Sequence, residues 1–205
     1  MSRQGTLYVV AAPSGTGKTT LVKALIEALP GITVSISHTT RPQRPAELEG
    51  VNYYFIAEDR FQQMIDHHDF LEHATVFNYH YGTSRSWVVN TLAQGIDVIL
   101  EIDWQGCEQI QHLFPECISI FILPPSLSDL AKRLRNRAQD SAEVIKQRLA
   151  DARETVSRIH YFNYVVMNAD FDTATHDLMA IVQANRLLQK KQSINLEKLL
   201  AEFTV

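Results

Sequence analysis

Residues 6–19 read TLYVVAAPSGTGKT, and this stretch decides the fold. The apolar, β-branched run at 6–11 predicts a buried strand, and the glycine-rich turn after it ends where a helical pattern begins. Gly15 and Gly17 can adopt backbone angles closed to other residues, so that successive N–H groups face one anion. A helix that starts near Lys18 adds N–H donors and a partial positive charge at its N-terminus. The stretch therefore predicts a phosphate site.

The side chains of this turn indicate which phosphate it binds. Lys18 would supply a full positive charge to the β- and γ-phosphates of a nucleoside triphosphate, and the Thr19 hydroxyl is placed for Mg²⁺. Ala12 stands where the GxxxxGK[ST] pattern has its first glycine, and the rest of the pattern is present. We expect ATP with Mg²⁺ here. The predicted ATP-binding residues of the turn are Ala12, Pro13, Ser14, Gly15, Thr16, Gly17, Lys18 and Thr19.

Apolar runs alternate with amphipathic stretches along most of the chain, which is the βαβ pattern of a parallel sheet covered by helices. Apolar residues recur at helical spacing in 21–29 and 178–188. The fold class is therefore α/β with a five-stranded parallel core sheet. The predicted central strands are 6–11, 33–37, 96–102, 118–123 and 164–167.

Two regions interrupt this alternation and predict insertions into a single domain. Residues 38–93, rich in Tyr, Phe and His, predict a small mixed α/β lobe. Residues 126–157 begin with a serine suited to cap a helix and carry many arginines, which is too polar for a core helix pair. The segment 191–205 predicts an amphipathic helix that packs on the body or on a second subunit, which leaves a homo-oligomer open. The core then comprises 1–37, 94–125 and 158–190.

Composition excludes several classes of protein. The chain has 205 residues, and a chain of this length buries about 70% of its unfolded surface. Its 19 basic and 23 acidic side chains give a net charge of −4, which argues against a nucleic-acid surface. Without a secretory signal or an apolar run of about 20 residues, we expect a cytoplasmic protein and no membrane partner. Cys107 and Cys117 are predicted to be free core thiols, and the histidines show no zinc pattern.

The inserted lobe carries a predicted clamp for a second phosphate. Arg41 and Arg44 lie three residues apart in a loop stiffened by prolines, and guanidinium groups bind phosphate oxygens in pairs. Tyr53 and Tyr81 can donate hydroxyl hydrogen bonds to the same group. Arginines in a loop are usually solvated surface, but a phosphate loop in the same chain favours the clamp.

Glu72 is a candidate for recognising a purine base. A carboxylate only accepts hydrogen bonds, and guanine presents adjacent N1–H and N2–H donors, whereas adenine has an acceptor at N1 and no 2-amino group. Sites built on such bonds reject an analogue by about 10⁴ to 10⁵. Ser37 or Thr83 would add a donor or acceptor at the base edge. Taken alone, Glu72 is as readily a surface carboxylate on a strand.

Together these segments resemble the guanylate kinase family over nearly the whole chain. The resemblance implies a P-loop kinase fold in which 38–93 is the GMP-binding lobe and 126–157 is a helical lid. It also implies transfer of the γ-phosphoryl group of MgATP to GMP or dGMP. The matching segments are APSGTGK at 12–18, SHTTRPQRPAE at 37–47, GVNYYF at 50–55, FLEHA at 70–74, YGTSR at 81–85, IDWQG at 102–106, FILPPS at 121–126 and RLRNR at 133–137.

The resemblance assigns roles residue by residue. Asp103 would lie near the base and, through water, near Mg²⁺, while Asn168 would lie near adenine. The implied ligands of the GMP phosphate are Arg41, Arg44, Tyr53 and Tyr81, and those of guanine are Ser37, Glu72 and Thr83. The implied catalytic residues are Lys18, Arg41 and the lid arginines Arg133, Arg137 and Arg148.

Four positions depart from the family pattern. Glu101 replaces a usual Asp, Ala46 a common Gly, Ala138 a Gly after the lid arginines, and Ala169 an acidic residue. None of these removes a charged group that the transfer requires. Two alternatives remain: a related binding module without catalysis that reads phosphopeptides through the clamp, and a P-loop kinase for a phosphorylated sugar. A GTPase is disfavoured because the sequence has no NKxD motif.

Overall fold

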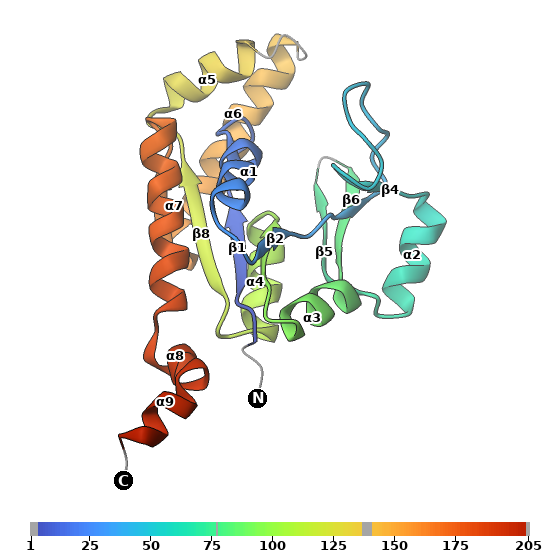
Figure 1. The fold of residues 1–205 in the computed structure, drawn as a ribbon. Helices are drawn as coiled ribbons and strands as arrows, with labels where there is room; N and C mark the ends of the chain where they lie inside the picture. The colour runs from blue at the N-terminus through green and yellow to red at the C-terminus, as the bar shows by residue number, and fades with distance from the viewer. Residues whose placement is uncertain (1–3, 77, 137–140, 204–205) are drawn as a thin grey trace.

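The computed structural model describes residues 4–76, 78–136 and 141–203, and it contains two β-sheets (Figure 1). The larger sheet has five strands in the order β2-β7-β1-β8-β9, and all its pairs are parallel. The predicted fold class is confirmed. The strands are β1 (Leu7–Ala11), β2 (Ile32–Val34), β7 (Asp97–Glu101), β8 (Ile118–Leu123) and β9 (Tyr164–Met167).

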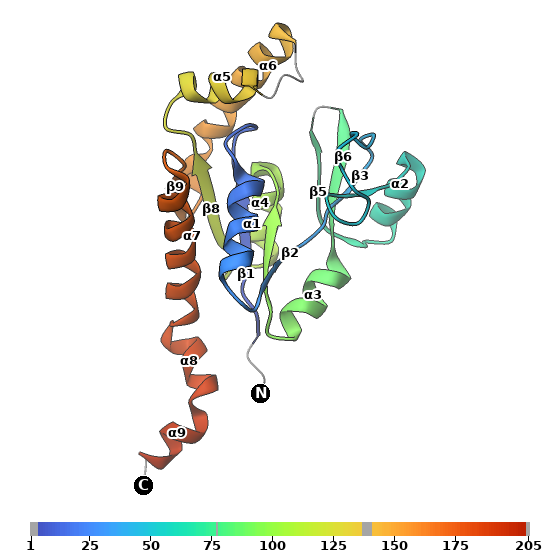
Figure 2. The ribbon, with the colours of Figure 1, turned by 45° about the horizontal axis from the view of Figure 1, so that its top comes forward.

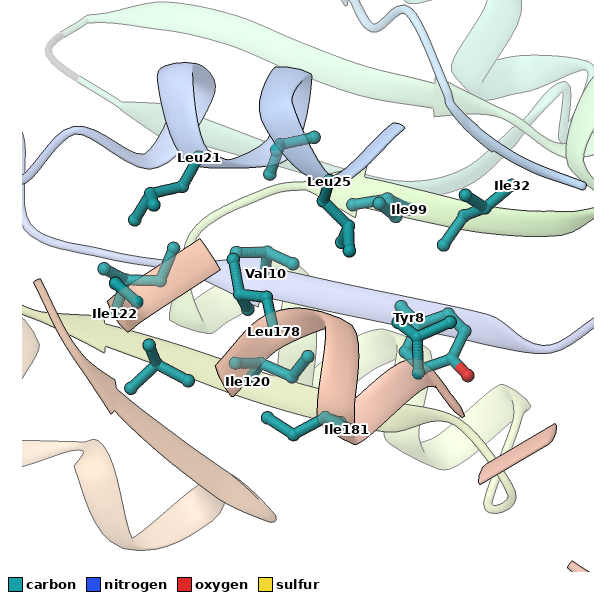
Figure 3. Packing of buried hydrophobic residues seen from close by; sticks show 14 of the residues in the cluster. Tyr8, Val10, Leu21, Leu25, Ile32, Ile99, Ile120, Ile122, Leu178 and Ile181 are labelled. Carbon is teal, nitrogen blue, oxygen red and sulfur yellow. The ribbon is translucent and has the colours of Figure 1, made fainter. Parts of the chain in front are cut away.

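Helices cover both faces of this sheet because its central strand, β1, is buried on both sides. Tyr8 and Val10 pack with one pair of helices, as Figure 3 shows, and Val9 packs with another pair on the opposite face. This pattern explains why β1 is a continuous apolar run. The first pair is α1 (Lys18–Ala28) and α7 (Phe171–Arg186), and the second is α3 (Arg85–Ala93) and α4 (Trp104–Leu113).

The second sheet has four strands in the order β4-β3-β6-β5, and it lies to one side of the first (Figure 1). The predicted strand at 33–37 is shorter in the structure, because the chain leaves β2 after Val34 and enters the second sheet at His38. Phe61 and Met64 of helix α2 (Glu58–Asp66) pack on this sheet. Its strands are β3 (His38–Thr39), β4 (Tyr54–Phe55), β5 (Phe70–Val76) and β6 (Tyr79–Ser84).

Two polar helices, α5 (Leu127–Asn136) and α6 (Ala142–Ser157), lie beyond the carboxyl end of the central sheet (Figure 2). They are held together by a small apolar core that includes Leu130 and Leu134. Leu134 also contacts the turn after β1, because a Cβ atom on Gly15 would lie 2.8 Å from its Cδ2 atom. A short 3₁₀ helix, η1 (Ile159–Tyr161), leads back to β9.

The chain ends in two short helices that extend away from the body (Figure 1), where the sequence predicts one. They are α8 (Gln189–Asn195) and α9 (Glu197–Glu202), and α9 is followed by the exposed Phe203. Among the described residues, every helix is too short or too polar to cross a bilayer. Cys107 and Cys117 are both buried and free, as predicted.

Candidate active site

The turn after β1 has the backbone geometry of an anion site. Gly15 and Gly17 have φ angles of 92° and 98°, a region that favours glycine, and Gly17 caps α1, which begins at Lys18. In a parallel sheet, ligands bind beyond the carboxyl ends of the strands where the strand order reverses, and β1 with its neighbours β7 and β8 forms such a point. The N-terminus of α1 therefore lies at the edge of the sheet where such ligands bind, while the N–H of Thr16 is already used in a bond to the carbonyl of Pro13 at 3.2 Å.

Lys18 connects this turn with the rest of the site. Its Nζ atom donates to the carbonyl of Ile102 at 3.5 Å. Burial lowers the pKa of Lys18, and the charges of Glu101, Asp103 and Glu72 oppose that shift. Glu101 ends β7 of the central sheet and Asp103 follows this strand, whereas Glu72 belongs to β5 of the second sheet. Both sheets thus contribute carboxylates to the field around one ammonium group.

Oxygen atoms suited to a hard cation gather beside this lysine. Thr19 Oγ1 donates to Glu101 Oε1 at 3.0 Å. Asp103 is the N-cap of α4, and its Oδ1 atom accepts from the N–H of Gly106 at 3.0 Å while Oδ2 accepts from Gln105 at 3.1 Å. Hydroxyl and carboxylate oxygens are the donors that Mg²⁺ prefers. The donor set therefore fits magnesium.

Arg133 of α5 bonds to the backbone of the phosphate turn. Its Nη1 atom donates to the carbonyl of Thr16 at 2.9 Å, and its Nη2 atom donates to the carbonyl of Asn168 at 2.8 Å. The side chain of Asn168 is buried and donates to the same Thr16 carbonyl at 2.7 Å. These three residues come from distant parts of the chain and meet at one peptide group.

The other two predicted lid arginines stand differently. Arg148 of α6 donates from Nη1 to the hydroxyl of Ser14 at 3.3 Å, so α6 also reaches the phosphate turn. Arg137 lies outside the described residues.

Of the remaining residues of the phosphate turn, Ala12 packs against the main core, and the carbonyl of Pro13 accepts a hydrogen bond from the Thr16 hydroxyl at 2.7 Å.

The predicted clamp is organised by Glu47, which the sequence analysis included only as the last residue of a matching segment and to which it gave no role. Its Oε1 atom accepts from Arg41 Nη2 at 2.7 Å, and Oε2 accepts from the backbone N–H of Arg44 at 2.9 Å. Burial alone would raise the pKa of Glu47, but the bonds from the two arginines outweigh it and lower the pKa. The Arg41 guanidinium lies 5.4 Å from the ring centroid of Tyr53, which is 5.8 Å from that of Tyr81. The position of Glu47, three residues after Arg44, was the sequence signal that could have predicted this pairing.

Tyr53 and Arg44 present different surfaces to an anion. Burial raises the pKa of Tyr53 to about 12, so its hydroxyl keeps its proton and remains a donor at neutral pH. Arg44 is exposed. The clamp thus combines a cation held against an aromatic ring, a protonated hydroxyl and an exposed cation.

Glu72 is buried rather than on the surface. It lies on β5 opposite Thr83 of β6, and Thr83 Oγ1 donates to Glu72 Oε1 at 2.5 Å. Only 3% of Glu72 is exposed, and this burial raises the pKa of its carboxyl to about 7. Its second oxygen, Oε2, lies against α4. Ser37 is half-buried just before β3, where its carbonyl accepts the N–H of Tyr54 at 2.9 Å.

Gly106 in the first turn of α4 makes room for this carboxylate. A Cβ atom at position 106 would lie 2.6 Å from Glu72 Oε2, which is closer than carbon and oxygen approach without displacement. Sequence reasoning included Gly106 only as part of a motif and gave it no role. A close approach between segments 34 positions apart leaves no signal in either segment alone.

Comparisons with known proteins agree on one family. The protein-family model described as guanylate kinase matches residues 4–185 of this chain. Curated guanylate kinases from Coxiella burnetii and Pseudomonas fluorescens are 53% and 54% identical to this chain and cover 96% and 97% of it, with the same shares of their own lengths. The crystal structure of guanylate kinase from Anaplasma phagocytophilum matches with a TM-score of 0.77 at 29% identity, over 93% of this chain and 90% of that one.

Proposed function

The chain belongs to the guanylate kinase family, and from that premise we propose which of its residues carry the reaction. The reaction is ATP:GMP phosphotransfer, in which the γ-phosphoryl group of ATP passes to GMP and gives ADP and GDP. One observation supports the assignment of residues: the first turn of α4 joins carboxylates of both sheets, because the N–H of Gly106 donates to Asp103 Oδ1 at 3.0 Å and a Cβ atom on Gly106 would lie 2.6 Å from Glu72 Oε2. The donor and acceptor sites therefore converge there.

On the donor side, residues 12–19 would bind the ATP phosphates, with Asn168 nearby. Thr19 and Asp103, the latter through water, would hold Mg²⁺, which supplies neutralisation of phosphate charge when bound. The hydrogen bond of Thr19 to Glu101 and the capping bond of Asp103 support this assignment, because each orients an oxygen beside Lys18. Lys18 would neutralise charge on the transferring group.

On the acceptor side, the clamp would bind the GMP phosphate and the buried acid would read the base. Glu72 as a carboxylate accepts from guanine N1–H and N2–H. Thr83, bonded to Oε1, supports this orientation, and Ser37 would add a polar contact at the base edge. The proposed ligands of the GMP phosphate are Arg41, Arg44, Tyr53 and Tyr81.

Catalysis then consists mainly of positioning and charge neutralisation, because the transition state of phosphoryl transfer is loose. The GMP phosphate is already a nucleophile, so a general base is not required. Arg41 orients it, and the lid arginines Arg133, Arg137 and Arg148 offset charge on the group in transit. Approach of α5 and α6 toward the second sheet would exclude water, which otherwise accepts the phosphoryl group.

A coupled assay with MgATP and a panel of acceptors tests these assignments. We expect rapid ADP formation with GMP and dGMP, and a kcat/KM about 10⁴-fold lower for AMP, UMP and ribose 5-phosphate. Comparable use of AMP would contradict the role of Glu72. Failure to form GDP from GMP would contradict the assignment of both sites.

A further inference from the structure

The carbonyl of Thr16 is a meeting point of hydrogen bonds inside the phosphate turn. Thr16 is fully buried, and its carbonyl accepts from Asn168 Nδ2 at 2.7 Å and from Arg133 Nη1 at 2.9 Å. A carbonyl oxygen has two lone pairs, so these two donors satisfy it completely. The Thr16 hydroxyl is also bound, since it donates to the carbonyl of Pro13 at 2.7 Å.

The direction of this carbonyl matters because the peptide group is planar and trans. A carbonyl fixed toward Asn168 turns the N–H of Gly17, in the same peptide, to the opposite side. A flipped peptide would direct a carbonyl dipole at the bound anion and withdraw a donor from it. Gly17 makes such a flip inexpensive, because a glycine adopts positive and negative φ about equally well. The turn therefore needs an external restraint at this peptide.

Asn168 is placed to supply that restraint. It follows β9 directly, and its N–H donates to the carbonyl of Leu123 at the end of β8, so its backbone belongs to the rigid sheet. Its own carbonyl accepts from Arg133 Nη2 at 2.8 Å. Its side-chain amide is buried and lies close enough to Gly17 that a Cβ atom there would be 2.8 Å from Nδ2. The side-chain amide of Asn168 is therefore fixed against the phosphate turn, where it donates to the Thr16 carbonyl.

We propose that Asn168 is a positioning residue for the ATP phosphates: its side-chain amide, with the guanidinium of Arg133, holds the Thr16 carbonyl away from the anion so that the turn keeps its N–H groups facing it. Its effect on ATP is therefore independent of the adenine base. This inference rests on the assignment of residues 12–19 to the ATP phosphates.

Asn168→Leu removes the amide donor while keeping a similar size. We measure the Kd of MgATP, the inhibition constant of magnesium tripolyphosphate, which has no base, and the Kd of GMP. Because the variant leaves a buried carbonyl short of one donor, we expect about a ten-fold weakening of MgATP and an equal weakening of tripolyphosphate. The Kd of GMP should stay unchanged, which a general loss of structure would not allow.

Asn185→Leu is the matched control. Asn185 is equally buried, and its Nδ2 atom donates to the carbonyl of Ile181 at 2.8 Å inside α7, away from the phosphate turn. This variant loses the same kind of bond and should bind both phosphate ligands as the wild type does. If it weakens them as much as Asn168→Leu, the effect is general destabilisation and the proposal is wrong.

Two other outcomes overturn the proposal while leaving the site assignment intact. Loss of MgATP binding with unchanged tripolyphosphate binding would mean that Asn168 reads the base. Unchanged binding of both ligands would mean that the Thr16 peptide keeps its direction without the amide. If the leucine variant does not fold, Asn168→Ala serves in the same measurements. A wild-type protein that binds neither MgATP nor tripolyphosphate would instead contradict the donor-site assignment.

Discussion

The phosphate turn is held by residues far away in the sequence, whereas the arginine clamp is held by its own neighbours. Thr16 accepts from Arg133 and Asn168, which lie 117 and 152 positions away. Arg41 is bonded to Glu47, only six positions away. The donor site therefore depends on the assembled central sheet and α5, while the clamp keeps its shape within its lobe. Such a lobe can move relative to the body without losing the arrangement of its arginines.

This difference predicts that substitutions separate cleanly into those that affect ATP and those that affect GMP. The largest effect is expected where the two sites share a residue. Lys18→Ala removes the full positive charge at the transferring group, and we expect kcat to fall by about 10³-fold or more. Because burial of the charged lysine is unfavourable, the thermal unfolding midpoint should not fall. GMP binding measured by calorimetry should persist, and full turnover would refute the role of Lys18.

Gly106→Ala tests whether a substitution in α4, which packs on the central sheet, can weaken the acceptor site without affecting the donor site. The new Cβ atom would lie 2.6 Å from Glu72 Oε2 and displace the carboxylate, so we expect the KM for GMP to rise about 100-fold, in line with losing an oriented buried partner. The KM for MgATP should stay constant. Glu108→Ala, an exposed change on the same helix, is the control and should leave both constants unaltered. Equal increases in both KM values would show that the two sites are not separable.

The same contrast explains what the sequence could predict. The phosphate turn is contiguous, so the pattern of Gly15, Gly17 and Lys18 predicts its backbone geometry from a few neighbouring residues. Buried parallel strands are likewise predictable, because each is a continuous apolar run. Both the turn's backbone geometry and the five-stranded sheet agree with expectation.

The acceptor site depends on strand pairing, which short segments do not specify. Glu72 lies opposite Thr83 only because β5 and β6 pair in that register, past an irregularity between Phe70 and Glu72. A shift of one residue would turn Glu72 to the other face of the sheet. Its burial, and with it the raised pKa, was therefore not predictable from composition or spacing. The contacts of Asn168 with Thr16 were hidden for a different reason, because they join the residue after β9 to a turn 152 positions earlier.

A pH profile sharpens the comparison, because the acceptor site has a buried acid whose pKa is raised to about 7 by burial. In the proposed role of Glu72, guanine pairs with the carboxylate form, so below pH 7 the Kd of GMP should rise about ten-fold per pH unit, and above pH 7 it should level off. Glu72→Gln should bind GMP more weakly and lose this dependence. Titration of the GMP phosphate is common to both proteins, so the ratio of their Kd values isolates Glu72. The Kd of MgATP should not follow this profile.

The same pKa makes a stability prediction of known sign. The folded protein holds the Glu72 proton more tightly than the unfolded chain, whose value is 4.5. Its contribution to the free energy of unfolding is therefore full below about pH 4.5 and is lost as pH rises through about 7. Urea denaturation should show wild type losing stability relative to Glu72→Gln as pH rises from about 4.5 to about 7. A constant difference between the two proteins would contradict the raised pKa.

The smallest expected effect tests whether the clamp is held locally. Glu47→Gln keeps an acceptor for Arg41 but turns an amide NH₂ toward the N–H of Arg44, and partly exposed pairs of this kind are worth up to about 1 kcal/mol. We expect the KM for GMP to rise about three- to five-fold with kcat and the KM for MgATP unchanged. Glu58→Gln is the control, because Glu58 is an acid of the same lobe whose partner is His80 rather than Arg41. The substitution alters no residue of the phosphate turn. A change in the KM for MgATP with Glu47→Gln would therefore mean that the clamp and the phosphate turn are structurally coupled.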